Sequence, residues 1–163
     1  MDKRLKDKEW RISHLYKIRN KEGELIPFKR NRAQKHFNEN KAQRNLILKS
    51  RQLGFTTDEA IDSLDDVLFT PNMDALMIAH NLEAGESIFS KKIVFAWEQV
   101  HQGIRELYGV DAKTSKTLKF DFGKKGFSSI AVDTSGRSGT YQRVHVTELA
   151  EISKKFPKKV PDI

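Results

Sequence analysis

The hydrophobic pattern along the chain alternates between strand-like runs and helix-like stripes. Residues 45–50 and 75–79 are short apolar runs bounded by polar residues, which is typical of buried strands. Between them, apolar residues recur every three or four positions from 60 to 68, and this spacing predicts one amphipathic helix. Thr56 followed by Glu59 matches a capping box that would begin this helix.

The second half of the chain continues this alternation. Residues 83–108 predict a long helix closed by Gly109, with an inner stripe of Phe89, Ile93, Trp97, Val100, Ile104 and Leu107. Residues 118–122 and 129–133 alternate on either side of a glycine-containing turn, which predicts a hairpin, and a last short strand follows at 144–147. The residues thus predict an α/β sheet with parallel core strands and an attached antiparallel hairpin.

Residues 1–30 form a basic N-terminal arm with a different pattern. The arm is dense in lysine and arginine, and apolar side chains interrupt the charge at irregular spacing. One interpretation is a short helix that docks through aromatics such as Trp10 and Tyr16. The other is a DNA-contacting arm, because basic segments with interleaved aromatic residues can hold phosphate and stack bases. The sequence alone leaves both interpretations open.

Composition narrows the class of protein. A length of 163 residues is about one domain, and the net charge of +8 favours an anionic partner. The absence of cysteine excludes disulfides, cysteine nucleophiles and cysteine-based zinc sites, and fits a reducing compartment. There is no apolar run long enough to span a membrane and no secretory signal in the first thirty residues. We therefore expect a soluble, cytoplasmic, basic domain.

The loop between the first predicted strand and helix has the architecture of a phosphate cradle. A strand that ends in a glycine-containing loop and opens a helix offers free N–H groups and the positive end of the helix dipole to an anion. The loop departs from G-x-x-x-x-G-K-[ST], because Lys49 and Phe55 replace the first glycine and the lysine, while Gly54 and Thr56 keep the pattern. The alternative is a plain strand–turn–helix corner in which Lys49 and Arg51 are solvated.

The strand at 144–147 runs directly into Glu148. Phosphoryl transfer to water needs a positioned Mg²⁺ and an attacking water oriented by a carboxylate. Thr147 stands where an aspartate is expected to support the metal, and its hydroxyl can still hydrogen-bond a metal-bound water. Alone, a carboxylate at a strand end is usually a surface residue; paired with the loop, Glu148 is a candidate catalytic base.

Other polar residues are interpreted as structural or solvent-facing. His80, like His14, His36 and His101, lacks metal-ligand spacing. Asp65 and Asp66 lie on a helix flank, where we expect them to be solvated. His145, in the strand before Glu148, is the histidine most favoured for a functional role.

Four motifs in order resemble those of large terminase subunits, the DNA-packaging ATPases of tailed bacteriophages. They are an adenine-recognition segment, a phosphate loop, the strand and helix between nucleotide motifs, and an acidic motif, at residues 27–34, 49–57, 77–84 and 144–150. The resemblance spans about residues 10–157. It implies a P-loop-type (ASCE) three-layer sandwich with a mainly parallel sheet, truncated before the last core strands. Residues 31–163 would be a partial ATPase domain, with the nuclease domain absent.

The same resemblance implies a Mg²⁺-dependent ATP hydrolase. Lys49 would neutralise the β- and γ-phosphates, and Arg51 would sense or stabilise the γ-phosphate. Glu148 would orient the attacking water, with Thr56 and Thr147 as metal-binding hydroxyls. Gln34 would read the adenine and belongs to an expected ATP-binding set of Gln34, Lys49, Ser50, Arg51, Gln52, Leu53, Gly54, Phe55, Thr56 and Thr57.

The partners implied by the resemblance are double-stranded DNA and, in full-length members, a small terminase subunit and a portal ring. The expected location is the host cytoplasm, with no membrane association. Two alternatives stay open. One is a helicase-like ATPase. The other is a non-hydrolysing basic DNA-binding or assembly module, which the atypical Phe55 and Thr147 favour.

Overall fold

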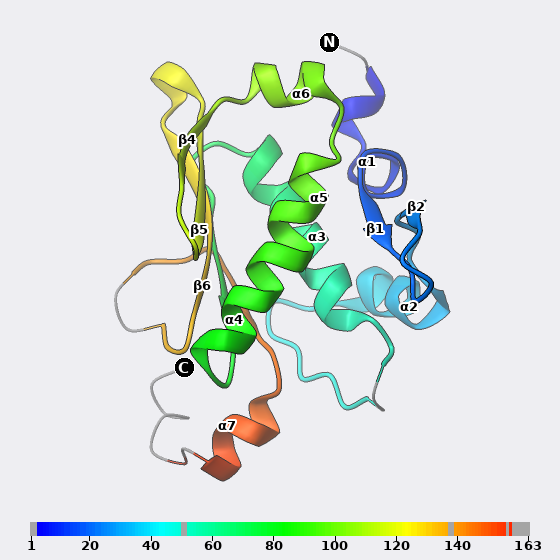
Figure 1. The fold of residues 1–163 in the computed structure, drawn as a ribbon, viewed down its shortest axis with the longest axis vertical. Helices are drawn as coiled ribbons and strands as arrows, with labels where there is room; N and C mark the ends of the chain where they lie inside the picture. The colour runs from blue at the N-terminus through cyan, green and yellow to red at the C-terminus, as the bar shows by residue number, and fades with distance from the viewer. Residues whose placement is uncertain (1–2, 50–51, 137–138, 156, 158–163) are drawn as a thin grey trace.

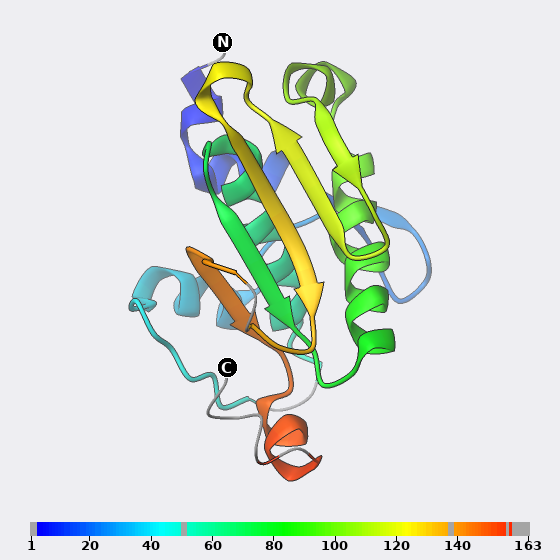
Figure 2. The same cartoon turned by 90° about the vertical axis from the view of Figure 1, so that its left-hand side faces the viewer.

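The computed structural model describes residues 3–49, 52–136, 139–155 and 157. Its largest sheet has five strands in the order β4-β5-β6-β3-β7. In chain order these strands are β3 (Asp74–Ile78), β4 (Val110–Lys113), β5 (Thr117–Asp121), β6 (Phe127–Asp133) and β7 (Arg143–Val146). A smaller sheet pairs β1 (Lys17–Arg19) with β2 (Leu25–Pro27). Figure 2 shows the larger sheet from its open side, with β3 between β6 and β7.

The larger sheet mixes parallel and antiparallel pairs. β3 is parallel to both β6 and β7, whereas β5 is antiparallel to β4 and β6. The predicted hairpin is confirmed as β5–β6, joined through a short 3₁₀ turn at Gly123–Lys125. Counting β1–β2, antiparallel pairs outnumber parallel pairs by three to two among the described strands. The predicted P-loop-type sandwich with a mainly parallel sheet is therefore wrong.

The described helices other than α7 (Leu149–Lys155) lie on one side of the sheet, so the described chain has two layers and not the predicted three (Figure 1). On the covered face, α3 (Phe55–Phe69) and the helical segments after β3 enclose the main core. On the other face, Leu76 and Ile78 pack with Ile152 of α7 and with Tyr141. A single short helix buries too little surface to make a third layer.

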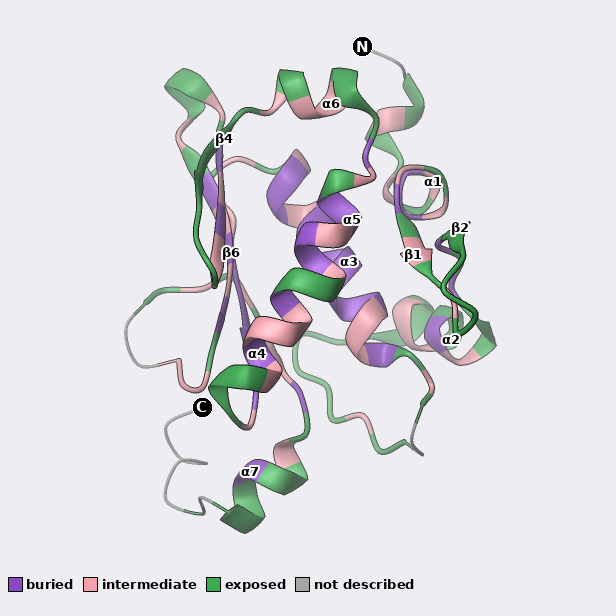
Figure 3. Cartoon of the chain, in the orientation of Figure 1, coloured by how far each residue is buried: buried purple, intermediate pink, exposed green. Residues whose placement is uncertain are grey.

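The buried strand predicted at residues 45–50 is wrong. Residues 45–49 are irregular, and Leu46 and Leu48 are 84% and 100% exposed. Figure 3 shows this connection as mostly exposed. A strand in this sheet needs a neighbouring strand to pair with, and in the described ranges none pairs with the outer edge of β7. Ser50, the last residue of the predicted run, lies outside the described residues.

The predicted helix after the loop is confirmed as α3, but its predicted capping box is wrong. Gly54, in the left-handed region with φ of 71°, is the N-cap, and no side chain of the described residues caps the helix. A capping box occurs instead on α2 (Arg32–Asn40), where Asn31 and Gln34 cap each other's backbone N–H groups. Spacing alone could not distinguish these two helix starts.

The single long helix predicted at 83–108 is broken. It consists of α4 (Leu82–Ile88), a wide π-helical segment (Phe89–Val94), α5 (Phe95–Glu98) and, after an interruption, α6 (Gln102–Leu107). His101 begins α6 by accepting a hydrogen bond from the Gly103 N–H. The inner stripe is buried through Val100, but Leu107 is 60% exposed because the helix has already turned away. None of the helices described is long and apolar enough to cross a membrane.

The N-terminal arm docks on α3, as one of its two interpretations expected. It contains a 3₁₀ turn (Lys3–Lys6) and α1 (Lys8–His14), and α1 packs against α3. Ile12 and Tyr16 are fully buried in the main core, whereas Trp10 stacks on His14 near the surface. Phe28 of the arm is buried in the same core, and Leu15 and Ile18 pack against it, so docking uses both aliphatic and aromatic side chains.

Candidate functional site

A cavity of about 490 Å³ opens at one end of the larger sheet. The carboxyl ends of β3, β6 and β7 lie at this end (Figure 2). Ligands of α/β sheets commonly bind outside the carboxyl ends of parallel strands. The lining combines the first turn of α3 with residues that follow β3 and β7 and with one side of the α4 region; its polar members include Lys49, Thr56, Thr57, His80, Lys92 and Glu148.

The first turn of α3 is built to leave backbone donors free. Among the described residues no side chain caps α3, which leaves the Phe55 and Thr56 N–H groups without a partner, whereas the Thr57 N–H donates to the Gly54 carbonyl at 3.1 Å. Its residues Phe55, Thr56 and Thr57 all line the cavity. Two features favour glycine at position 54. Its φ of 71° is left-handed, and an added Cβ would lie 2.9 Å from Gln34 Nε2. The positive end of α3 therefore faces the cavity, and the one acidic residue of its first turn, Asp58, is paired with Arg30.

Gln34 ties α2 to the loop. Its side-chain amide donates to the Leu53 and Gly54 carbonyls at 3.3 and 2.9 Å, and its Oε1 accepts from the Asn31 N–H at 2.8 Å. The side chain is 3% exposed and is not part of the cavity lining. Both of its hydrogen-bonding groups are engaged with the backbone in this structure. The adenine-reading role of Gln34 remains a prediction.

The other residues of the expected ATP-binding set have different surroundings in the structure. Gln52 lines the cavity with a left-handed φ of 64°, and Leu53 supplies a carbonyl to α2. Phe55 is buried and packs edge-on against Phe37, with ring centroids 5.6 Å apart. Lys49 lines the cavity and is exposed. Ser50 and Arg51 lie outside the described residues.

Lys92 is a cavity cation that the sequence analysis did not identify. It comes from the π-helical segment, and its Nζ donates to Thr57 Oγ1 at 2.7 Å. Burial lowers the pKa of Lys92, and no carboxylate opposes that shift. Phe55 at the usual lysine position was the one signal that a cation had to come from elsewhere.

The acidic end of the cavity is formed where β7 stops. The Thr147 N–H donates to the Ile78 carbonyl at 2.9 Å, which continues the pairing of β7 with β3 by one residue. Glu148 then takes a left-handed φ of 57°. His80 Nδ1 lies 2.7 Å from Glu148 Oε2, at ion-pair distance. His80, interpreted from the sequence as structural or solvent-facing, is thus in the cavity beside the predicted catalytic carboxylate.

The oxygen donors in the cavity fit a magnesium ion that arrives with phosphate. The described residues hold no cluster of three or more histidine or acidic side chains that could bind a metal by themselves. Thr56, Thr147 and Glu148 all line the cavity. Mg²⁺ is usually held by one or two protein groups together with waters and substrate phosphates. His145 is not part of this lining, and burial lowers its pKa.

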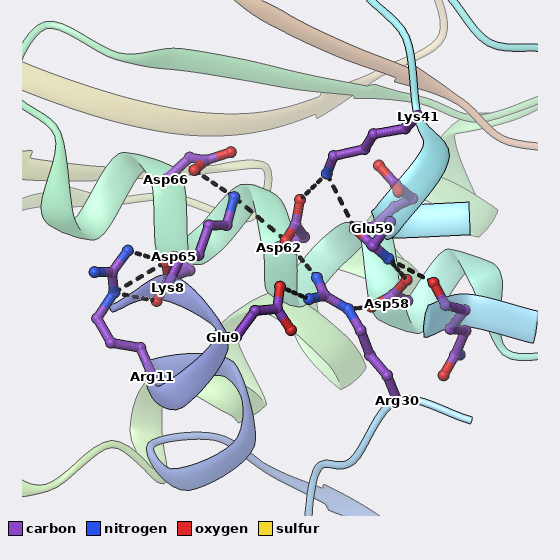
Figure 4. A network of polar contacts seen from close by, with 12 residues as sticks. Lys8, Glu9, Arg11, Arg30, Lys41, Asp58, Glu59, Asp62, Asp65 and Asp66 are labelled. Carbon is purple, nitrogen blue, oxygen red and sulfur yellow. Dashed lines mark hydrogen bonds and ion pairs between the residues drawn. The ribbon is translucent and has the colours of Figure 1, made fainter. Parts of the chain in front are cut away.

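A second polar region lies along α3, away from the cavity. We call it the acidic face of α3, formed by Asp58, Glu59, Asp62, Asp65 and Asp66. Figure 4 shows basic side chains from the arm and from Lys41 converging on it. Arg11 donates to Asp65 at 2.6–3.1 Å, and Tyr16 Oη donates to the same carboxylate at 2.9 Å. The prediction that Asp65 and Asp66 are solvated is wrong, since Asp65 is fully buried and Asp66 is partly buried.

Two arginines bridge several carboxylates of the acidic face. Arg30 reaches Asp58 at 2.7 Å and Asp62 at 2.5 Å. Arg143, from β7, contacts Asp62 at 2.6 Å and also pairs with Glu59 and Asp66. Although burial opposes ionisation, the charges of Arg143, Lys8 and Lys41 hold the pKa of Asp62 far below its usual range. This region is a closed network of matched charges.

No protein-family model matches the chain, and no curated protein matches it. A function for the cavity is therefore inferred from its residues and geometry.

Proposed function

We propose that the chain binds ATP with Mg²⁺ in this cavity and hydrolyses it, as the ATPase part of a terminase-like DNA-packaging machine. The observation that carries the proposal is the cavity, in which the uncapped start of α3, two lysines and a strand-end carboxylate line one space of about 490 Å³. Small-molecule sites typically have volumes of about 300–1,000 Å³. The order of the four sequence motifs supports the DNA-packaging part.

The phosphate chain of ATP would lie against the first turn of α3. Free N–H groups and the helix dipole favour anions there. Lys49 and Lys92 add positive charge from two other segments of the chain. Bound Mg²⁺ would neutralise charge on the phosphates, and the Thr56 and Thr147 hydroxyls are the protein groups that would hold it.

Glu148 would orient the attacking water. Catalysis of phosphoryl transfer depends mainly on positioning and electrostatics, so a fixed carboxylate is the main chemical requirement. His80 Nδ1 lies 2.7 Å from Glu148 Oε2, at the edge of a carboxylate whose side chain is 57% exposed. The left-handed backbone of Glu148 costs about 1–2 kcal/mol for a residue other than glycine. Such strain is concentrated at functional sites, where it holds a side chain in a required direction.

Nucleotide binding and turnover of the wild type, Lys49→Ala and Glu148→Gln test the proposal. We expect calorimetry to show ATP binding by Glu148→Gln with turnover lowered about 10²–10⁴-fold, and weaker ATP binding by Lys49→Ala. Glu151→Gln is the matched control, because Glu151 is an exposed carboxylate of α7 that pairs with Lys155.

Three results would contradict parts of the proposal. A wild type that does not bind ATP would refute it altogether. Unchanged turnover in Glu148→Gln would remove Glu148 as the base. A wild type that binds ATP and never hydrolyses it would favour the non-hydrolysing module, for which the buried Phe55 and the uncharged Thr147 are the specific observations.

A further inference from the structure

The Lys92 ammonium group lies close to the start of α3, which is where the lysine of a phosphate-binding loop would be expected. In the G-x-x-x-x-G-K-[ST] loop, a lysine at the helix start reaches the phosphates. Here that position is Phe55, whose ring is buried against Phe37. The Lys92 ammonium instead lies 2.7 Å from Thr57 Oγ1, although the two residues are 35 positions apart in the sequence. A cation is thus present at the helix start, but it comes from a different element.

The positive charge of Lys92 has no carboxylate partner in the described part of the chain. Its only hydrogen bond there is to the neutral hydroxyl of Thr57. Removing an ammonium group from water is costly unless an anion compensates it. Because Lys92 lines the cavity, an anion bound there can supply that compensation.

We infer that Lys92, together with Lys49, binds the phosphate chain of the ligand and replaces the lysine missing at Phe55. This inference rests on the proposed ATP site and names the part of the ligand that the cation recognises. Lys92 belongs to the π-helical segment, and its side chain reaches Thr57 in the first turn of α3. Wide π turns within helices occur frequently at functional sites. The recognised chemistry is therefore a polyphosphate, independent of base and sugar.

The experiment compares Lys92→Met with Lys91→Met. Lys91 is the adjacent residue on the same segment and is exposed, so its variant controls for the loss of one positive charge. The probes are Mg-ATP and inorganic tripolyphosphate, measured by calorimetry. We expect Lys92→Met to weaken both by about 10- to 100-fold, as expected for loss of one charge-assisted hydrogen bond. Lys91→Met should leave both affinities within about twofold of the wild type.

A second measurement separates ligand binding from a structural role. Without ligand, Lys92→Met should unfold at the same Tm as the wild type or at a higher one, because methionine avoids the cost of partly desolvating an ammonium group. A clearly lower Tm for ligand-free Lys92→Met would make Lys92 a structural residue and overturn the inference. Lys92→Arg, which keeps the charge, should retain tripolyphosphate binding better than Lys92→Met.

The inference and the proposed function fail in different ways. If the wild type binds Mg-ATP and Lys92→Met binds it equally well, Lys92 has no phosphate role and the ATP site stands. If the wild type binds neither Mg-ATP nor tripolyphosphate, both are wrong.

Discussion

The acidic face of α3 and the cavity at its N-terminus are both rich in cations, but they use charge in opposite ways. Along the acidic face, Lys8, Arg11, Arg30, Lys41 and Arg143 each pair with at least one carboxylate. In the cavity, Lys49 and Lys92 form no ion pair with any described residue, and burial lowers the pKa of Lys92. Matched charges hold the fold together, and unmatched charges remain for a ligand. The net charge of +8 could not distinguish the two.

Breaking a matched pair should have the largest effect. Arg11→Met leaves the fully buried Asp65 with the Tyr16 hydroxyl as its one hydrogen-bond partner among the described residues. We expect the free energy of unfolding, measured with urea near neutral pH, to fall by about 3–5 kcal/mol. The surface pair Lys113–Glu98 is the control, because its partners are 46% and 49% exposed. Lys113→Met should cost under about 1 kcal/mol. An equal cost for both variants would contradict the assigned role of the buried network.

Gly54→Ala should lower stability by an intermediate amount and should also weaken ligand binding in the cavity. The left-handed φ of 71° costs a residue with a Cβ about 1–2 kcal/mol, and the Cβ would also press on Gln34 Nε2. Gly23→Ala is a matched control, since Gly23 has a φ of 84° but no atom within 4 Å of an added Cβ. We expect a larger loss of Tm for Gly54→Ala than for Gly23→Ala, with weaker tripolyphosphate binding only for Gly54→Ala. Equal effects on binding would show that the start of α3 does not contact phosphate.

The smallest expected effect is the contribution of Lys92 to the pH dependence of stability. The pKa of Lys92 in the folded chain lies below its ordinary value of 10.5 because of burial. The unfolded chain therefore binds more protons than the folded chain between these two values, so stability rises with pH in this window. Without ligand, the wild type should gain Tm relative to Lys92→Met as the pH rises toward 10.5. A difference that is constant with pH would mean that Lys92 is not desolvated.

Local patterns predicted the elements that depend on local interactions. The hairpin β5–β6 follows from alternation on both sides of a glycine turn, and α3 from three- and four-residue spacing. The run at 45–50 failed because hydrophobicity does not reveal whether a partner strand exists. The acidic face was missed because its partners are distant: Arg11 is 54 positions from Asp65, and Arg143 is 84 positions from Glu59.

In the candidate site, too, the sequence predicted the residues that belong to short local motifs and missed those that packing brings in from other elements. The loop and Glu148 were each recognisable from short motifs, and the structure places both in one cavity. Lys92 lies outside all four motifs, and His80 lies within the motif at residues 77–84 but was interpreted as structural or solvent-facing. Their contribution depends on how the elements pack, which the sequence shows only indirectly through the replacement of a lysine by Phe55.

The acidic face of α3 also has a consequence for how the chain folds. α3 contains no lysine or arginine, and its carboxylates at positions 58, 62 and 66 are four residues apart, where like charges oppose helix formation. The cations that relieve this repulsion lie on both sides of α3 in the sequence. Arg143 leaves the ribosome long after the helix itself has been made. Lys8, Arg30 and Lys41 precede α3 and already pair with these carboxylates, so we expect the synthesis of β7 to add only the last part of the charge compensation of α3.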